Sequence, residues 1–350
     1  MYPFYLGIDL HLKRTYVVLM DKAGQVLDER RLPNEEVKEY LKRRVPKETY
    51  AVVEATRNWA FMYDMLVEHV ERVELAHPKE LKAISAAAVK TDKVDARTLA
   101  NLARINYLPI AYAAPHEVRD LRTEVRHRDR LVSERTQAKN RIHAVLASYN
   151  LVAPTADLFG VRGRQYLEEV INNQLRSAAV RVIRSDLALI EHLTQQIAEA
   201  ESATHLSTEQ AQQVKLLCTM PGVGRVGAIT LLAEIGNIQR FNSPKALCNW
   251  AGLTPKVRSS DLQVHHGRIS KQGPALVRAA MTRAATIASR YSKRWYRVHE
   301  NLVPRCGRQA AKVAVARHLL TVIYYVLKRQ EPYQEDYIAK TGEPAALQGA

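Results

Sequence analysis

The chain has 350 residues, a formal net charge of +16 and three cysteines. Its length suffices for roughly two or three domains with a sizeable core, and its positive charge favours a polyanionic partner. The cysteines are far apart, which argues against both a disulfide framework and a cysteine zinc site. No segment approaches the roughly 18 apolar residues that span a bilayer, and no signal peptide is recognised. We therefore expect a cytoplasmic protein without a membrane partner.

The N-terminal third predicts alternating strands and helices. Three short strands joined as hairpins come first, and Asn34 is expected to be the N-cap of the helix that follows. The expected strands cover residues 4–10, 15–20, 26–31, 50–54 and 73–76, and later helices cover about 59–69 and 92–104. Hairpin strands followed by alternating helices and strands are typical of the ribonuclease H fold, so we expect an α/β domain here.

Four acidic residues lie within these expected strands and helices. Asp9 lies in an apolar strand, where an unpaired charge is costly, and Glu54 ends a second apolar strand. Asp92 and Asp95 are three residues apart, which puts both carboxylates on one face of a helix. Like charges this close need a cation, and carboxylate oxygens suit Mg²⁺ or Mn²⁺.

Each acid alone has a more ordinary explanation. A strand aspartate is commonly a capping or turn residue, and acids at a helix start commonly serve the helix dipole. Their combination, in the strand and helix order of a ribonuclease H fold, favours a metal-dependent nuclease site instead.

The middle of the chain predicts a helical arm. Residues 116–149 contain no Gly or Pro, many cations and a narrow apolar stripe, which indicates one long helix. A second helix is expected over about 168–201, with the segment 160–163 as the turn between them. Its coiled-coil spacing is carried by Leu175, Ala179, Val182, Leu189, Leu193 and Ile197. Two interpretations fit this pattern. The helices can form an ordinary antiparallel pair exposed to solvent, or an oligomerisation arm whose basic face follows a phosphate backbone.

The segment after this arm is typical of a helix-hairpin-helix. A helix ends in Pro-Gly-Val-Gly at 221–224, and another begins at once. Gly222 and Gly224 would let the backbone approach a phosphate, which Arg225 and the free N–H groups of the second helix would bind. The same hairpin also occurs as plain structure.

The C-terminal third is strongly basic. Twelve Lys and Arg residues lie between positions 256 and 308, against two acids. Arg268, Lys271 and Arg278 belong to this group and are predicted nucleic-acid contacts. Ser270 stands between two of these cations, with His265 and His266 as nearby candidate bases. A loop serine is most often a turn or capping residue, and Pro274 is expected to begin the next helix.

These motifs together resemble a known family nearly end to end. They are Gly7-Ile-Asp9, Val53-Glu54-Ala55, Lys90-Thr-Asp92-Lys-Val-Asp95-Ala96, Pro221-Gly-Val-Gly224, Gly252-Leu-Thr-Pro255 and Gly267-Arg-Ile-Ser270-Lys-Gln-Gly273. The chain resembles the DEDD transposases of the bacterial insertion-sequence family numbered 110. The family often has Ser-Gly soon after Gly-Leu-x-Pro, whereas this chain has Ser259-Ser260-Asp261, which affects only the connecting loop.

The resemblance implies a RuvC-like DEDD domain (1–112), a helical coiled-coil arm (113–205), a mainly helical transposase domain with the helix-hairpin-helix and serine motif (206–335) and a tail (336–350). Asp9, Glu54, Asp92 and Asp95 become the metal-binding acids, and Ser270 becomes the nucleophile. The implied partners are the element ends and target DNA, a structured guide RNA, and further copies of the chain as a dimer or tetramer.

The function that the resemblance implies is RNA-guided, site-specific recombination, in which DNA is cut and rejoined. Two other functions compete with it. One is a hydrolytic endonuclease of the Holliday-junction type, in which activated water attacks and Ser270 only binds. The other is a nucleic-acid-binding scaffold without catalysis. The intact set of acids argues against the scaffold, and the Gly267–Gly273 block argues against plain hydrolysis.

Overall fold

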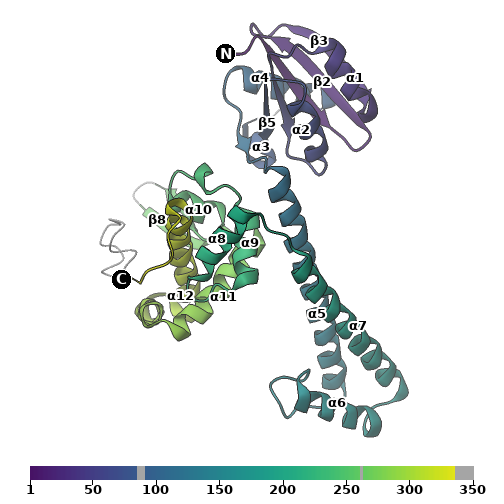
Figure 1. Cartoon of the computed structure of the whole chain (residues 1–350), viewed down its shortest axis with the longest axis vertical. Helices are drawn as coiled ribbons and strands as arrows, with labels where there is room; N and C mark the ends of the chain where they lie inside the picture. The colour runs from purple at the N-terminus through teal and green to yellow at the C-terminus, as the bar shows by residue number, and fades with distance from the viewer. Residues whose placement is uncertain (85–90, 261–262, 336–350) are drawn as a thin grey trace. The chain divides into compact units, whose positions relative to one another are not determined.

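A computed structural model describes residues 1–84, 91–260 and 263–335 (Figure 1). The chain divides into two compact units, Met1–Ala114 and Pro115–Ala350. The first unit is mixed α/β and the second is mostly helical, as expected from the sequence. The predicted tail 336–350 and Lys90, the first residue of one motif, lie outside the described residues. The division into four parts stays a prediction.

The N-terminal unit is built on a mixed sheet with the strand order β3-β2-β1-β4-β5-β6. The central strand β1 is antiparallel to β2 and parallel to β4. The strands are β1 (Phe4–Leu10), β2 (Arg14–Asp21), β3 (Val26–Pro33), β4 (Thr49–Glu54), β5 (Arg72–Ala76) and β6 (Ile110–Ala111). Five of these strands agree with the sequence prediction to within about two residues at each end. The hairpin turn before β3 uses Gly24 at φ 90°, a conformation that glycine adopts without strain.

Helices cover both faces of this sheet. Alternate residues of β1 point to opposite faces, so Leu6 and Ile8 pack on one side and Tyr5 on the other. The first side is covered by α1 (Val37–Arg44) and α2 (Trp59–Val67), and the second by α3 (Pro78–Ile84) and α4 (Asp92–Arg104). Helix α4 begins and ends where the sequence predicted.

The predicted N-cap at Asn34 is wrong. Residues Asn34–Glu36 form a short 3₁₀ turn (η1), and α1 begins only at Val37. The Asn34 side chain instead accepts from Thr15 Oγ1 at 2.6 Å and donates to the carbonyls of His11 and Leu12 at 3.0 and 3.1 Å. These bonds fasten the turn between β1 and β2, so the side chain is no longer available for a helix end.

The arm begins with a single long helix, α5 (His116–Ser148), as predicted. The expected second helix is wrong in extent, because the chain forms α6 (Val161–Asn173) and α7 (Ser177–Ala203). The segment 160–163 is likewise no turn, since Gly163 lies inside α6. A Cβ there would lie 2.3 Å from the carbonyl oxygen of Asp157, so glycine permits close packing rather than a change of direction.

The buried face of α7 differs from the predicted seam. Ile183 and Ile190 are buried, whereas Val182 and Leu189 are 47% and 39% exposed. Asp186 is buried on the same face as Ile183 and Ile190, and it receives three hydrogen bonds from the Arg141 guanidinium of α5. An ion pair therefore stands within the α5–α7 contact, and self-association through the arm stays a prediction.

The rest of the second unit packs around one core. Its elements are α8 (Thr208–Cys218), α9 (Arg225–Ile235), η2 (Ile238–Arg240), α10 (Pro244–Trp250), β7 (Pro255–Ser260), β8 (Gln263–Ile269), α11 (Ala275–Tyr291) and α12 (Lys293–Arg329). Leu217, Ile229, Met281 and Leu319 bring α8, α9, α11 and α12 together. The predicted helix start at Pro274 is shifted by one residue, since Pro274 is the N-cap of α11.

Helix α12 is the one element of the described residues that is long and apolar enough to cross a membrane by length and composition. Its most apolar window has a mean hydropathy of 1.4, and 56% of that window is buried inside the protein. The helix is also kinked at Gly307, which has a φ of 78°. Residues such as Leu319 and Ile323 belong to the core, which accounts for their apolar character.

Candidate metal and DNA-processing site

The sheet places Asp9 and Glu54 side by side. In the parallel pair of β1 and β4, Ile8 is in register with Val53, and the two acids follow these residues. Both acids point to the face covered by α4, because they are two residues beyond Gly7 and Val52 of that face. Asp9 is only 8% exposed, and Glu54, at the end of β4, is half-buried.

Helix α4 brings two further acids, Asp92 and Asp95, to the carboxyl ends of β1 and β4. Its N-cap is Thr91, whose hydroxyl accepts a hydrogen bond from the Val94 N–H at 3.3 Å, and Asp92 begins the helix. The helix lies close to β1 because the facing strand residue is Gly7. A Cβ at Gly7 would be 1.9 Å from the carbonyl oxygen of Ala96, one turn after Asp92. A glycine in the strand thus allows the helix acids to reach Asp9.

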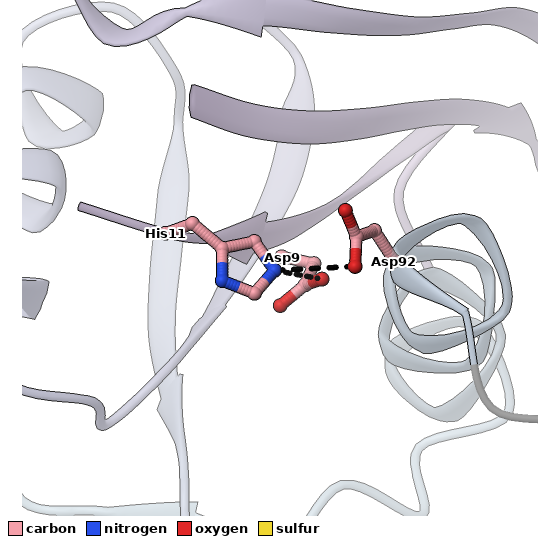
Figure 2. Close-up of side chains that lie close together, drawn as sticks. All are labelled: Asp9, His11 and Asp92. Atoms are coloured by element: carbon pink, nitrogen blue, oxygen red, sulfur yellow. Dashed lines mark hydrogen bonds and ion pairs between the residues drawn. The ribbon is translucent and has the colours of Figure 1, made fainter. Parts of the chain in front are cut away.

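A histidine joins the acids that the sequence predicted. Nε2 of His11 lies 3.2 Å from Asp9 Oδ2 and 3.2 Å from Asp92 Oδ1, and Figure 2 shows the ring directed between the two carboxylates. Asn58 and Asn34 donate to the His11 carbonyl and so fix the turn that carries the ring. Sequence reasoning missed His11, although its position two residues after a strand aspartate was a signal.

The electrostatics of the site favour a bound cation. Burial raises the pKa of the Asp9 carboxyl, and the negative charges of Asp92 and Asp95 raise that pKa further, while His11 opposes them. Arg31 Nη2 is 3.7 Å from Asp92 Oδ2 and supplies some positive charge. The carboxylates of Asp92 and Asp95 repel that of the buried Asp9, and a bound cation offsets this repulsion.

The donor atoms fit a divalent metal. Among the described residues, one atom each of Asp9, His11 and Asp92 lie within 4.8 Å of one another, which is compatible with ligands of one ion. Asp95 acts on the pKa of Asp9 but is outside this group, as is Glu54. Carboxylate oxygens suit Mg²⁺ and Mn²⁺, and an imidazole is a better ligand for Mn²⁺ than for Mg²⁺.

Ser270 lies in the second unit, whereas the acids lie in the first. It follows β8, its N–H donates to the Thr254 carbonyl at 2.9 Å, and its half-buried hydroxyl accepts from the Gln272 N–H at 3.4 Å. The next residue, Lys271, is exposed and has a left-handed φ of 54°. The side chains of His265 and His266, the candidate bases, lie outside the described residues.

Arg278 braces the loop that carries Ser270. Its Nη1 donates at 2.9 to 3.3 Å to four carbonyls, those of Ala251, Gln272, Gly273 and Pro274. Gly273 makes the loop fit, because a Cβ there would lie 1.9 Å from the Trp250 carbonyl oxygen. A nucleic-acid contact by Arg278 stays a prediction, as it does for the exposed Arg268 and Lys271.

The two glycines of the predicted helix-hairpin-helix have different surroundings. Gly222 has a φ of 80°, and a Cβ on it would lie 2.3 Å from the Ala284 carbonyl oxygen, so this glycine packs the hairpin on α11. Gly224 caps α9, and no described atom lies within 4 Å of its ideal Cβ position. Gly224 and the next residue, Arg225, are exposed, but their contact with a phosphate stays a prediction.

Comparison with known proteins identifies the class of this protein. A DEDD transposase model of the IS110 family matches residues 6–151, which include all four predicted acids. A second model, described as "Transposase IS116/IS110/IS902 family", matches residues 214–300, which include Ser270. The chain is therefore a DNA transposase or recombinase.

Curated relatives support the same assignment. The transposase for insertion sequence element IS1111A of Coxiella burnetii is 26% identical over 75% of this chain and 72% of its own length. A "Probable family 20 transposase" of Pseudomonas aeruginosa is 24% identical over 94% of this chain and 98% of its own length. The pilin gene-inverting protein of Moraxella bovis is 24% identical over 82% of each chain. This protein belongs to the IS110 family of insertion-sequence transposases.

Proposed function

We propose that this transposase is a site-specific recombinase of an insertion sequence, which cuts and rejoins DNA with the acidic site of its first unit and Ser270 of its second. The observation that carries the proposal is the meeting of Asp9, His11 and Asp92 at one sheet edge. The strand order supports a RuvC-like interpretation of this unit. The pilin gene-inverting relative supports recombination rather than simple cutting.

The metal of this site is proposed to be Mg²⁺ or Mn²⁺. Asp9, Asp92 and His11 would hold it. Asp95, whose charge acts on Asp9, and Glu54, on the neighbouring strand, are proposed as further ligands although they lie outside this group of atoms. When bound, the metal supplies positive charge that polarises the scissile phosphate and stabilises the leaving oxygen. Asp9 would keep its carboxylate ionised at neutral pH because the cation offsets the burial that raises its pKa.

Ser270 is proposed to act as the nucleophile. Its Oγ would form a bond to phosphorus as the bond from phosphorus to the 3′ oxygen of the DNA breaks, leaving a phosphoserine. Arg268 and Lys271 would neutralise the phosphate as charge develops. Covalent attachment conserves the phosphodiester energy for rejoining to a new partner. The site would be composite, formed when the two units meet within one chain or between chains.

The partners are proposed from the family resemblance. DNA binding follows from membership of a transposase family. A structured guide RNA and assembly into a dimer or tetramer are inferred from the resemblance, as is a cytoplasmic location. Copurified RNA that sequences to one structured species would support guidance by RNA.

Adduct trapping tests the nucleophile. A nicked suicide substrate incubated with wild-type protein and Mg²⁺ should leave a covalent adduct that maps to Ser270. Ser270→Ala should give neither the adduct nor recombination, while Asp9→Asn should retain DNA binding and lose cleavage. An adduct on another residue, or strand exchange by Ser270→Ala, would exclude the proposed role.

Hydrolysis is the second candidate function. One observation favours hydrolysis: Asp9, His11 and Asp92 all belong to the first unit, so the acidic site is assembled without any residue of the second unit. A hydrolase of this kind would leave Ser270→Ala able to cut a branched DNA substrate at nearly the wild-type rate. The same variant therefore separates the two functions.

A further inference from the structure

A basic pocket lies beside α12, in the second unit and apart from the Ser270 loop. Three cations on the first turns of that helix line it, namely Lys293, Arg294 and Arg297. The pocket is open to solvent and has a volume of about 460 Å³. Ligand pockets commonly measure roughly 300–1,000 Å³, which exceeds the size of a single phosphate and suits a nucleotide.

Residues on both sides of the kink of α12 line this pocket. Gly307 has φ 78° and ψ 159°, a combination outside the helical region, and the helix changes direction there. His318, which lies beyond the kink, lines the same pocket as Arg294 and Arg297 from before it. Trp295 anchors the first part, since it is 1% exposed and its indole N–H donates to Tyr333 at 3.2 Å.

The charges in this pocket are largely uncompensated. In the described part of the chain, no carboxylate forms an ion pair with Lys293, Arg294 or Arg297. Glu335 also lines the pocket, but its carboxylate accepts a hydrogen bond from the Ser292 hydroxyl at 3.3 Å. Three cations against one acid favour an anionic ligand.

The other lining groups suit a nucleotide better than a bare anion. Burial and the charge of Arg317 lower the pKa of His318 to about 4, so its ring is neutral at pH 7 and able both to donate and to accept a hydrogen bond. Val298 and Leu302 add an apolar wall against which a sugar can rest. Arginine side chains bind phosphate through two parallel N–H groups.

We propose that this α12 pocket binds a phosphodiester group of a nucleic-acid strand, with the adjoining sugar against Val298. The proposal rests on the assignment as a DNA transposase. It does not depend on the metal site or on Ser270, because it concerns binding alone. The strand is DNA of the element or RNA, and binding measurements with both distinguish the two sources.

Two kinds of variant test the pocket in different ways. Arg294→Gln with Arg297→Gln removes two cations, and Asn301→Trp fills the pocket from an exposed position without changing the net charge. The control, Lys42→Gln with Arg44→Gln, removes the same charge from exposed positions of α1 in the other unit. Circular dichroism establishes that each variant is folded.

The measurement is the fluorescence anisotropy of labelled single-stranded DNA, single-stranded RNA and duplex DNA of one sequence, in EDTA, over a range of salt concentrations. The charge variant should bind about tenfold more weakly near physiological salt. Its plot of log K against log salt should be shallower by about 0.7 to 0.9 for each phosphate that the variant no longer neutralises. Asn301→Trp should weaken binding several-fold at an unchanged net charge. The control should bind like the wild type.

The nucleic acid whose affinity falls most is the one the pocket binds, and an equal fall for all three means that the shared phosphodiester is recognised. Wild-type affinity in both pocket variants would overturn the proposal. An equal fall in the α1 control would overturn it too, because the effect would then come from net charge. Since EDTA prevents cleavage, a failure of the proposed chemistry leaves this result unaffected.

Discussion

Gly7 of β1 and Ala96 of α4 lie so close that a Cβ on the glycine would be 1.9 Å from the alanine carbonyl oxygen and 2.7 Å from the Ala100 nitrogen. Both atoms belong to the helix backbone, which cannot rotate away as a side chain can. The contact sets the distance from Asp9, two residues further along the strand, to Asp92 at the start of the helix. The geometry of the candidate metal site and the packing of the strand are therefore linked through one glycine.

Gly7→Ala should consequently disturb both stability and the metal site. We expect a decrease of about 3 kcal/mol in the free energy of unfolding, at the upper end of overpacking effects, and weaker Mn²⁺ binding. Chemical denaturation and calorimetric titration measure the two. Gly227→Ala in α9 is the control, since no described atom lies within 4 Å of its ideal Cβ, and it should be neutral or stabilising. An unchanged stability of Gly7→Ala would contradict the close approach.

His11→Ala tests whether the imidazole is a metal ligand. Because Nε2 lies 3.2 Å from both Asp9 and Asp92, we expect Mn²⁺ affinity to fall by at least the roughly 10- to 100-fold that removing a group beside a metal ligand costs. Electron paramagnetic resonance of free Mn²⁺ gives the affinity without any activity assay. His69→Ala, whose ring bonds to the Met65 carbonyl in α2, should bind like the wild type. Equal affinities in all three proteins would remove His11 from the ligands.

Arg126→Met should strongly destabilise the second unit. Its guanidinium on α5 donates at 2.7 and 2.9 Å to Glu234 of α9, which is only 2% exposed. Glu234 is buried, whereas the Arg126 side chain is 54% exposed, so removing the arginine leaves a buried carboxylate that solvent screens only in part. We expect a cost of about 2–3 kcal/mol, below that of breaking a fully buried pair. Replacing Glu234 by Leu as well should restore much of the stability.

Arg128→Met is the matched control for that pair. Arg128 bonds to Glu201, whose side chain is 39% exposed, so the change should cost less than about 1 kcal/mol. Both variants are measured by urea denaturation. Equal destabilisation by the two substitutions would show that the burial of Glu234 is not what matters.

Stability should fall as the pH drops from about 6.5 to about 4 because of His318. Burial and Arg317 lower its pKa to about 4 in the folded protein, so in this window the unfolded chain binds more protons than the folded one. The stabilisation that the neutral His318 ring contributes is complete above the pKa of histidine in the unfolded chain. It is lost as the pH falls toward the pKa of His318 in the folded protein, which lowers the free energy of unfolding by up to about 3 kcal/mol. Denaturation at pH 7.5 and 4.5 measures the difference.

His318→Gln should reduce this pH dependence, because it removes the buried titrating ring. His192→Gln, a change at an exposed histidine of α7, should keep it. A pH dependence in His318→Gln as steep as in the wild type would assign the effect to other groups.

The sequence by itself determined the elements whose signal is local. Strand β1, helix α4 beginning at Asp92 and the long α5 all followed from periodicity and from the residues near their ends. The placement of Asp9 within β1 and of Glu54 at the end of β4 followed too, since the pattern of apolar residues fixes which strand carries each acid. The family resemblance added the likeness to transposases, which matches to family models and relatives then established.

Only the tertiary structure decided which side chains meet across long separations in the chain. His11 reaches Asp92, 81 positions later, because Gly7 lets α4 lie close to β1. Asn34 bonds to the turn at His11 instead of capping α1, and Asp186 is buried against Arg141 whereas Val182 is exposed. These outcomes depend on competition between partners distant in sequence, whose free energies local periodicity does not contain.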